Sequence, residues 1–460
     1  MRRFVFVSMV GLALASSVSA AEPRSDAVLE PLLQHALAHS PELMAAQARA
    51  AAGASRPRAE RGLPPSMLSV VYTNDGWSPT LGEMEMTTLG VMASQPLPDP
   101  GRRALRARRA ERSAAQSEQQ ARRACLDLVA GVTRAYHDLR LSRALVAVAR
   151  EQGALWEEIE ASARARYAAG LGPQLEVMRA QVEVTRSRER VIAREAEAEG
   201  RLLELNRRAA RPLTDAIGET PPLDLASLLA SLDEILQAAE TESPELRAAH
   251  EAREGQHLAV ALARRQARPE WNVQAGYMNR GGLDPMWQAG LGVSWPLFSR
   301  GAIRAGTAVA AEEERAAERD VEVVRADLLL RTRQRFARLA ALARGADLYG
   351  NGILPQGQLA LEAAQAQYRA GRAPLVSVLD AMSALVQDRA TYLEQIAAHE
   401  SLKARLWSFS LEPDEGGMPA APSMGARPPM GAAPAPMGAA GGPMTTPPAD
   451  GGTSGMGEGR

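Results

Sequence analysis

The sequence predicts a mainly α-helical protein with a small β part, built as a two-fold repeat of helix, β-hairpin, long helix, turn and returning helix. Three observations predict this fold class. Short landmark sequences recur in the same order in both halves of the chain. Two stretches alternate strictly between apolar and polar residues, which is typical of half-buried strands. Each alternating stretch is followed by about 65 residues of helix-forming composition with few turn signals.

The overall composition fits this class. The 460 residues are 46% hydrophobic but only 4% aromatic, which suits long helices better than a compact mixed core. The formal net charge of −1 argues against nucleic acid as a partner. Cys125 is the single cysteine, so a disulfide framework is excluded, and no cysteine follows the N-terminal segment to carry a lipid.

The N-terminus is predicted to be a secretory signal peptide, residues 1–21. Met1-Arg2-Arg3 precedes an apolar run from Phe4 to Ala15, and small residues lead to cleavage after Ala20 or Ala21. The alternative is a membrane anchor, but the apolar run is shorter than the ~18 residues that a spanning helix needs.

The internal repeat rests on matched landmarks in one order. Ser40-Pro41-Glu42-Leu43 recurs as Ser243-Pro244-Glu245-Leu246, and Tyr167-Ala168-Ala169-Gly170 recurs as Tyr368-Arg369-Ala370-Gly371. Between these landmarks, five residues recur 200 positions later: Gly90, Ser94, Pro96, Leu97 and Gly101. The chain is therefore predicted to be two copies of one long unit.

Each copy is expected to open with a helix of about 20 residues, capped by Ser40 or Ser243 with proline at the first helical position. These helices are predicted to run to Glu60 and Gln266.

Two β-hairpins are expected next. In the second, Trp287 to Trp295 alternates apolar residues with small or polar ones, and Trp271 to Met278 forms the preceding strand. In the first, the strands run from Leu68 to Thr73 and from Thr88 to Ser94. The predicted loops are 74–86 and 279–285. Four tryptophans fall in the hairpins, which fits the edges of a lipid layer: Trp77, Trp271, Trp287 and Trp295.

Long helices are predicted from Arg102 to about Arg166 and from Ala302 to about Gln367, about 98 Å each at 1.5 Å per residue. Gly350, Gly352 and Pro355 predict an interruption in the second. The returning helices are expected to reach Arg211 and Phe409.

The returning helices carry apolar residues spaced three and four apart, which is typical of coiled coils. The second has one such seam: Leu375, Val378, Met382, Leu385, Tyr392 and Ile396. The first has two seams, Leu175-Met178-Val182 and Val177-Ala180-Val184-Val191. Two seams suit a helix with a neighbour on each side, as in a cylinder of helices.

Four strands per chain cannot close a barrel, because known membrane barrels begin at about eight strands. Open strand edges are not tolerated in lipid. The chain is therefore expected to oligomerise, and either two copies or three would satisfy this argument.

The ordered set of landmarks over residues 28–411 resembles the TolC family of outer-membrane efflux channels. The resemblance is carried by the doubled Ser-Pro-Glu-Leu, the Ser-x-Pro-Leu strand exits, the doubled Tyr-x-x-Gly turn and Val378-Leu379-Asp380-Ala381. The segment from Gln95 to Arg102 is most similar to the branch that serves heavy-metal efflux pumps of the RND type.

This resemblance implies a homotrimer in which a 12-stranded β-barrel continues as an α-helical barrel into the periplasm. It implies an outer-membrane location, a periplasmic adaptor and an inner-membrane RND-type pump as partners, and no cofactor. The expected divisions are a first repeat, residues 22–222, a second repeat, residues 223–411, and a tail, residues 412–460.

The resemblance also implies that the Tyr-x-x-Gly turns are the periplasmic tips that form the gate. The implied tip residues are Tyr167, Gly170, Glu176, Tyr368, Gly371 and Asp380. Asp380 matches an acid that forms a ring in some members, and a ring of acids favours cations. A second acid is common three residues earlier, where this chain has Ser377, so the ring is expected to be thinner. The alternative is that Asp380 is a solvated acid near a helix start.

The tail, residues 412–460, is rich in Pro, Gly, Ala and Met and is expected to be disordered. Thioethers are soft ligands that suit Cu(I) or Ag(I). Six methionines are the candidate metal ligands: Met418, Met424, Met430, Met437, Met444 and Met456. The alternative is a spacer in which methionine is incidental. His35 and His39, one helical turn apart, are a weaker candidate pair.

No hydrolase, phosphate-binding, zinc-protease or redox motif occurs, so the chain is not expected to be an enzyme. The predicted function is a passive outer-membrane conduit of a tripartite efflux system, with copper or silver ions as the expected cargo. Drug efflux or type I secretion stays open as the cargo alternative. A soluble periplasmic coiled-coil adaptor or scaffold is the alternative of a different class.

Overall fold

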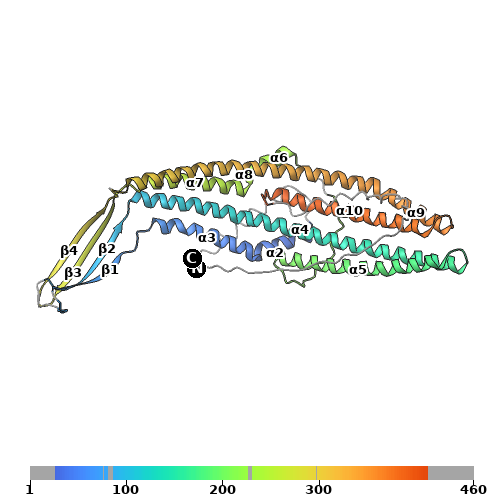
Figure 1. Ribbon diagram of the computed structural model, residues 1–460, viewed down its shortest axis with the longest axis horizontal. Helices are drawn as coiled ribbons and strands as arrows, with labels where there is room; N and C mark the ends of the chain where they lie inside the picture. The colour runs from blue at the N-terminus through green and yellow to red at the C-terminus, as the bar shows by residue number, and fades with distance from the viewer. Residues whose placement is uncertain (1–25, 76, 81–85, 226–229, 297, 413–460) are drawn as a thin grey trace, which may run out of the picture. The chain divides into compact units, whose positions relative to one another are not determined.

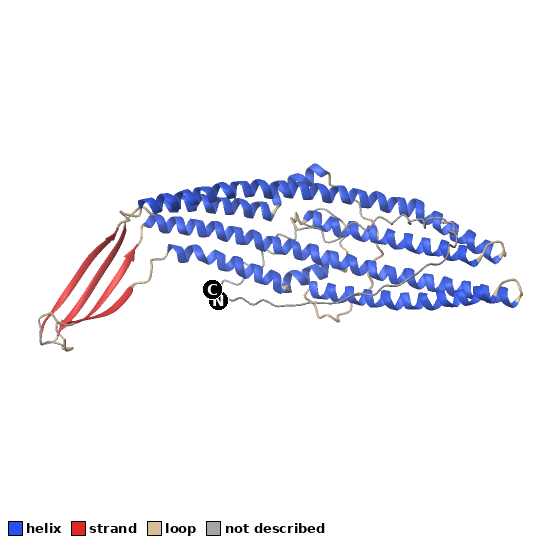
Figure 2. Ribbon diagram, in the orientation of Figure 1, coloured by secondary structure: helices blue, strands red, loops and turns tan. Residues whose placement is uncertain are grey.

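The computed structural model describes residues 26–75, 77–80, 86–225, 230–296 and 298–412. Those from 26 to Leu411 belong to one compact unit. The predicted signal peptide and all six tail methionines lie outside the described residues. Figure 1 labels the elements, and Figure 2 separates helices from strands.

The elements of the first half recur in the same order in the second. The first half runs α2 (Leu29–His39), α3 (Pro41–Arg61), β1 (Met67–Thr73), β2 (Thr88–Leu97), α4 (Pro100–Ala168) and α5 (Gln174–Arg208). The second runs α6 (Leu232–Glu242), α7 (Pro244–Arg265), β3 (Glu270–Arg280), β4 (Leu283–Ser294), α8 (Arg300–Leu348), η2 (Tyr349–Ile353), α9 (Leu354–Arg369) and α10 (Leu375–Trp407). The predicted mainly α-helical fold with a small, doubled β part is confirmed.

The serine caps form as predicted, but a short helix precedes each of them. Ser40 Oγ accepts a hydrogen bond from the Leu43 amide at 3.4 Å, and Ser243 Oγ accepts one from Leu246 at 3.4 Å. Each serine also ends the preceding helix, α2 or α6, by donating its amide to a carbonyl of that helix. The sequence analysis missed α2 and α6 because 11 residues give a weak periodic signal.

The first long helix, α4, is continuous over 69 residues, whereas the second is interrupted. Between α8 and α9 the chain makes one π turn at Tyr349–Ile353, where the sequence predicted an interruption. Gly350 and Gly352 lower the helical propensity there, and Pro355 lacks an amide hydrogen for the ladder. A π turn absorbs this defect without ending the helix.

Three large buried clusters, and a smaller one between α7 and α8, hold the described helices together. One joins α2 and α4 with the end of α5, through Leu32, Tyr136 and Leu205. Its counterpart in the second half joins four helices, with Ile235 from α6, Leu246 from α7, Leu328 from α8 and Leu406 from α10. The third is shared by both halves and lies between α4, α5, α9 and α10. The two halves are therefore packed as one helical body.

The two hairpins form one antiparallel sheet in the order β1-β2-β3-β4, because β2 pairs with β3. Two predicted details are wrong. β2 does not end at Ser94 but runs to Leu97, which faces Trp271. The second loop is not 279–285: the strands continue to Arg280 and from Leu283, and Gly281, at φ +68°, leads the turn between them. Pro285 is tolerated because it lies at the irregularity in the β3–β4 register and has no paired residue there.

The strand register gives the sheet two different faces. Residues directly opposite in paired strands share a face, so Val70 with Val91, Val91 with Tyr277 and Tyr277 with Trp287 define one row. This apolar face carries exposed large side chains from all four strands: Leu68, Val70, Tyr72, Leu89, Val91, Trp271, Val273, Tyr277, Trp287, Leu291 and Val293. The polar face carries mainly Ser, Thr, Gly, Asn and Gln, with several methionines.

Ion pairs join the sheet to the helices at its base. Asp99, the N-cap of α4, accepts from the Arg102 amide at 3.1 Å and from Arg265 Nη1 at 3.0 Å. Arg102 in turn pairs with Glu270 at the start of β3. Burial opposes the charged form of Asp99, but the hydrogen bond and charge of Arg265 and the hydrogen bonds from the Gly101 and Arg102 amides together lower its pKa. These contacts fix the exit of the first hairpin against the entry to the second.

None of the helices in the described part of the chain is apolar over a stretch long enough to span a bilayer.

Replacing Ser243 by alanine removes the cap of α7 and is expected to cost about 1 kcal/mol of folding free energy. Ser243→Gly should cost less than Ser243→Ala, because glycine is a better N-cap residue than alanine. Thermal unfolding of the purified protein, followed by helical circular dichroism, measures the difference. Ser55→Ala is the control, since Ser55 is exposed and bonds only the Ala51 carbonyl of its own helix. Equal melting temperatures for all variants would contradict the role of the cap.

Candidate functional site: the paired helix turns

The candidate site consists of the two turns that lie at the opposite end of the helices from the sheet (Figure 1). One turn joins α4 to α5, and the other joins α9 to α10. The two turns are the doubled Tyr-x-x-Gly landmarks of the sequence, residues 167–170 and 368–371.

Both turns have the same backbone geometry. In the first, the Leu171 amide donates to the Arg166 carbonyl at 2.8 Å and the Gly170 amide to Tyr167 at 2.9 Å. The second turn repeats this pair of bonds, from Arg372 to Gln367 and from Gly371 to Tyr368, at 2.9 Å each. This pattern is a Schellman motif, which needs a residue with positive φ at the helix end.

Glycine supplies that conformation in both copies. Gly170 has φ +71° and Gly371 has φ +72°, a region that costs other residues about 1–2 kcal/mol. Pro173 and Pro374 follow and precede α5 and α10. Glycine and proline therefore reverse the chain sharply at both turns.

Tyr368 links the second turn to the first half of the chain. Its side chain is only 2% exposed, and its hydroxyl donates to Glu176 Oε2 of α5 at 3.1 Å. Burial, together with the nearby Glu176 carboxylate, raises the pKa of Tyr368 to about 12. The phenol therefore keeps its proton at physiological pH and remains a donor to Glu176.

Arg166 makes a second link, which the sequence analysis missed. Its guanidinium donates to the Tyr368 carbonyl at 2.6 Å and to the Leu171 carbonyl at 3.1 Å, so it binds both turns at once. It also lies over the Tyr368 ring, 4.9 Å from the centroid, in a cation–π contact. A basic residue in the last turn of a helix was visible in the sequence, but its partners 202 and more residues away were not.

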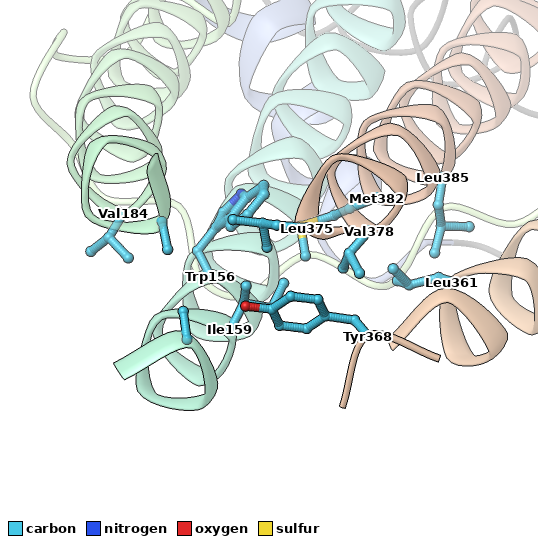
Figure 3. Close-up of a cluster of buried hydrophobic side chains, with 11 residues drawn as sticks. Trp156, Ile159, Val184, Leu361, Tyr368, Leu375, Val378, Met382 and Leu385 are labelled. Atoms are coloured by element: carbon cyan, nitrogen blue, oxygen red, sulfur yellow. The ribbon is translucent and has the colours of Figure 1, made fainter. Parts of the chain in front are cut away.

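The third buried cluster packs α4, α5, α9 and α10 together next to these two links. Trp156 and Ile159 of α4 pack with Tyr368 of α9 and with Leu375 and Val378 of α10 (Figure 3). Ala180 and Val184 of α5 complete the same cluster. The predicted seam of α10 is buried here, as its residues at 375, 378, 382 and 385 are all in the cluster.

The structure brings some of the predicted tip residues together and not others. Glu176 and Tyr368 bond directly, and Gly170 and Gly371 shape the turns beside them. Tyr167 is half exposed and Asp380 is exposed on α10, outside this cluster. Ser377, the position of a second acid in the resembling family, uses its amide to bond the Pro374 carbonyl.

We looked among the described residues for a metal site made of His, Cys, Asp or Glu side chains. Within them, no three His, Cys, Asp or Glu side chains come together to hold a metal ion. His35 and His39 stack at 4.3 Å, and each bonds a backbone carbonyl through Nδ1, to Ala209 and His35 respectively. This pair therefore has a structural use within α2 and at the end of α5.

A sheet with one exposed apolar face, continued by paired long helices, is the architecture of an outer-membrane efflux protein, and the sequence agrees. The family model described as outer membrane efflux protein matches residues 32–209 and 235–404. The chain belongs to the outer membrane efflux protein family. Proteins of this family are channels, so the chain is not an enzyme. A comparison with curated protein sequences gives no match.

Solved structures show the same fold. CusC, whose structures are described with folding and transmembrane channel formation, is 17% identical, with 85% of this chain and 95% of that chain covered and a TM-score of 0.70. The outer membrane protein VceC of Vibrio cholerae is 19% identical, with coverages of 83% and 95% and a TM-score of 0.69. The MtrE outer membrane channel of Neisseria gonorrhoeae, in its open state, is 19% identical, with coverages of 84% and 89% and a TM-score of 0.68.

Replacing Arg166 by glutamine is expected to loosen the second turn, because the turn loses a charged donor to the Tyr368 carbonyl. Hydrogen–deuterium exchange of peptides covering Gly371 and Arg372 should be about tenfold faster, which corresponds to about 1.4 kcal/mol of opening free energy. Arg164→Gln is the matched control, because Arg164 is exposed and pairs only with Glu160 of its own helix at 2.7 Å. Equal exchange in the two variants would contradict the link.

Proposed function

We propose that three copies of this chain assemble into an outer-membrane conduit for efflux. In this proposal the strands form a 12-stranded barrel in the outer membrane, and the helices form a tunnel into the periplasm. The turns meet a periplasmic adaptor coupled to an inner-membrane RND-type pump. The exported cargo is a soft metal ion, Cu(I) or Ag(I).

The apolar face of the sheet is the observation that carries the proposal. Val70 is 72% exposed and Leu291 is 66% exposed, and the exposed apolar side chains are continuous across four strands. A soluble protein rarely leaves so large an apolar patch in water. Lipid on this side and water on the polar side would satisfy both faces. This argues against a soluble adaptor or scaffold.

The sheet edges support assembly of several copies. β1 and β4 are edge strands of the sheet, so the outer backbone groups of each need a partner in lipid. Pairing β4 of one copy with β1 of the next would supply these partners. Three copies of a four-stranded sheet give twelve strands, which lies within the range of known barrels.

The helices offer a matching contact surface. Of the two seams predicted on α5, Ala180 and Val184 of one are buried within the chain. The other is exposed at Leu175, Met178 and Val182, with Met178 54% exposed. A helix of a neighbouring copy packed against this face of α5 would bury the second seam as well.

The paired turns suit a gate that meets an adaptor. They are the extreme ends of the helices, and each is a tight reversal set by glycine. The links from Tyr368 and Arg166 hold the two turns of one copy together. Breaking these links would free the two turns from each other, while the buried cluster between α4, α5, α9 and α10 would still hold the helices behind them. Asp380, exposed beside them, would form a ring of three carboxylates around the axis.

The metal cargo rests on the resemblance of residues 95–102 to the heavy-metal branch and on the methionine-rich tail. A wide conduit discriminates little between cargoes, so the pump is expected to make the selection.

Arginine on the apolar face is expected to abolish membrane assembly. Val70→Arg or Leu291→Arg should each cost about 2–4 kcal/mol if the side chain meets lipid. Ser69→Arg and Gln288→Arg, on the polar face of the same strands, are the controls and should be tolerated. Outer-membrane fractionation followed by electrophoresis of unheated samples measures the oligomer. Full assembly of the Val70→Arg and Leu291→Arg variants would disprove insertion, and a soluble wild-type protein would favour the scaffold alternative.

The tail provides a test of the cargo. Changing all six tail methionines to leucine should lower copper and silver tolerance of the cells, because leucine has no sulfur ligand. Oligomer yield should stay unchanged, because methionine and leucine are similar in volume and hydrophobicity. Changing six tail alanines to leucine controls for added bulk. Unchanged metal tolerance would make the tail a spacer and leave drugs or secreted proteins as the cargo.

A further inference from the structure

The polar face of the sheet carries one methionine on each strand, and their positions form a row. Met67 lies on β1, Met92 on β2, Met278 on β3 and Met286 on β4. We call these four residues the methionine row. The six tail methionines play no part in it, and none of the landmark sequences contains any of its members.

The strand register places neighbouring members of the row within reach of one another. Met278 and Met286 face each other directly across β3 and β4. Met92 faces Gly276, two residues from Met278, and Met67 faces Ser94, two residues from Met92. Directly opposite Cβ atoms lie about 5 Å apart and diagonal neighbours about 7–8 Å apart, within reach of long side chains.

Glycines leave space for the central thioethers. Gly90 lies opposite Met278, and a Cβ at Gly90 would stand 2.8 Å from Met278 Cγ. The Met278 side chain therefore leans over β2, the strand that carries Met92. A Cβ at Gly276 would stand 3.8 Å from Met92 Cβ. Met92 and Met278 are half-buried, whereas Met67 and Met286 are exposed.

The chemistry of the polar face makes these methionines unusual there. Apart from Val71, their neighbours on this face are mainly small or polar, such as Ser69, Ser94 and Gln274. None of the paired residues of the apolar face is a methionine, although that is where apolar side chains collect. A need for apolar filling alone therefore does not explain where the methionines lie.

We propose that the methionine row is a low-affinity thioether site for monovalent soft cations, Cu(I) or Ag(I), on the inner wall of the conduit. The proposal rests on the proposed function, because only a closed sheet makes the polar face an inner wall. Uncharged sulfur ligands favour Cu(I) and Ag(I) over Zn²⁺ or Mg²⁺, which prefer nitrogen and oxygen. Weak binding suits a conduit, because an ion must both enter a site and leave it.

The test uses the full chain with its six tail methionines changed to leucine and with Cys125→Ser, so that neither the tail nor the free thiol competes for silver. Ag⁺ in chloride-free buffer is titrated into the purified protein by calorimetry. X-ray absorption at the silver edge then reports the ligand atoms. We expect Ag⁺ to bind with sulfur neighbours, and we expect Zn²⁺ and Mg²⁺ not to bind to the row.

Leucine substitutions locate the site. Met278→Leu should weaken Ag⁺ binding about tenfold, which corresponds to about 1.4 kcal/mol. Changing all four members of the row should abolish binding. Met44→Leu, an exposed methionine on α3, is the matched control and should leave binding unchanged. If the fourfold variant fails to assemble, the single Met278→Leu variant still decides the outcome.

Two results would overturn the proposal: unchanged Ag⁺ binding in the Met278→Leu and fourfold variants, or silver bound without sulfur neighbours. Electrophoresis of the same unheated samples separates this failure from failure of the proposed function. Loss of silver binding in an assembled membrane oligomer supports the site. Silver binding by the row in a soluble, unassembled protein would support the site and contradict the conduit.

Discussion

Packing against one continuous helix organises this protein. α4 runs for 69 residues and packs against α2, α3, α5, α7 and α10, so it contacts helices of both halves. Each of these partner helices is shorter than α4. None of them covers its whole length, so they lie end to end along it. The second long helix tolerates a π turn at Tyr349–Ile353, whereas α4 stays unbroken. The same helix carries Asp99 as its N-cap at the sheet and Arg166 in its last turn at the paired turns, so it sets the separation of the sheet from the tips.

The two faces of the sheet differ in polarity, and this difference sets what must surround the sheet. The apolar face cannot remain in water without a large hydrophobic cost, at about 25 cal/mol per Å² of apolar surface. The edge strands β1 and β4 add a second requirement, because unpaired backbone groups are costly in lipid. One chain satisfies neither requirement. The outer-membrane location that the family implies would cover the apolar face, and the proposed assembly of several copies would pair the edge strands.

The paired turns show how a doubled sequence yields an asymmetric contact. Both turns use the same Schellman bonds and the same positive-φ glycine, so their local structure is alike. Their side chains are not equivalent: Tyr368 is buried and bonds Glu176, whereas Tyr167 is half exposed. Arg166 of the first turn donates a hydrogen bond to the Tyr368 carbonyl of the second. At the matching position the second turn has Gln367 instead of arginine. The internal repeat therefore gives two turns with the same backbone structure, and the side chains that differ between them bind one turn to the other.

The sequence by itself determined the features that depend on residues near each other in the chain. Period-2 alternation predicted the strands, the serine caps predicted α3 and α7, glycine predicted both reversals, and Gly350 to Pro355 predicted the break in the second long helix. Only the tertiary structure decided the pairing of β2 with β3, the tight turn led by Gly281, the two-turn contact of Arg166 and the row formed by Met67, Met92, Met278 and Met286. Helix and strand signals are local, because hydrogen bonding and side-chain periodicity repeat over a few residues. Register and cross-repeat contacts join residues far apart in the chain, and they are fixed only when the two halves pack together.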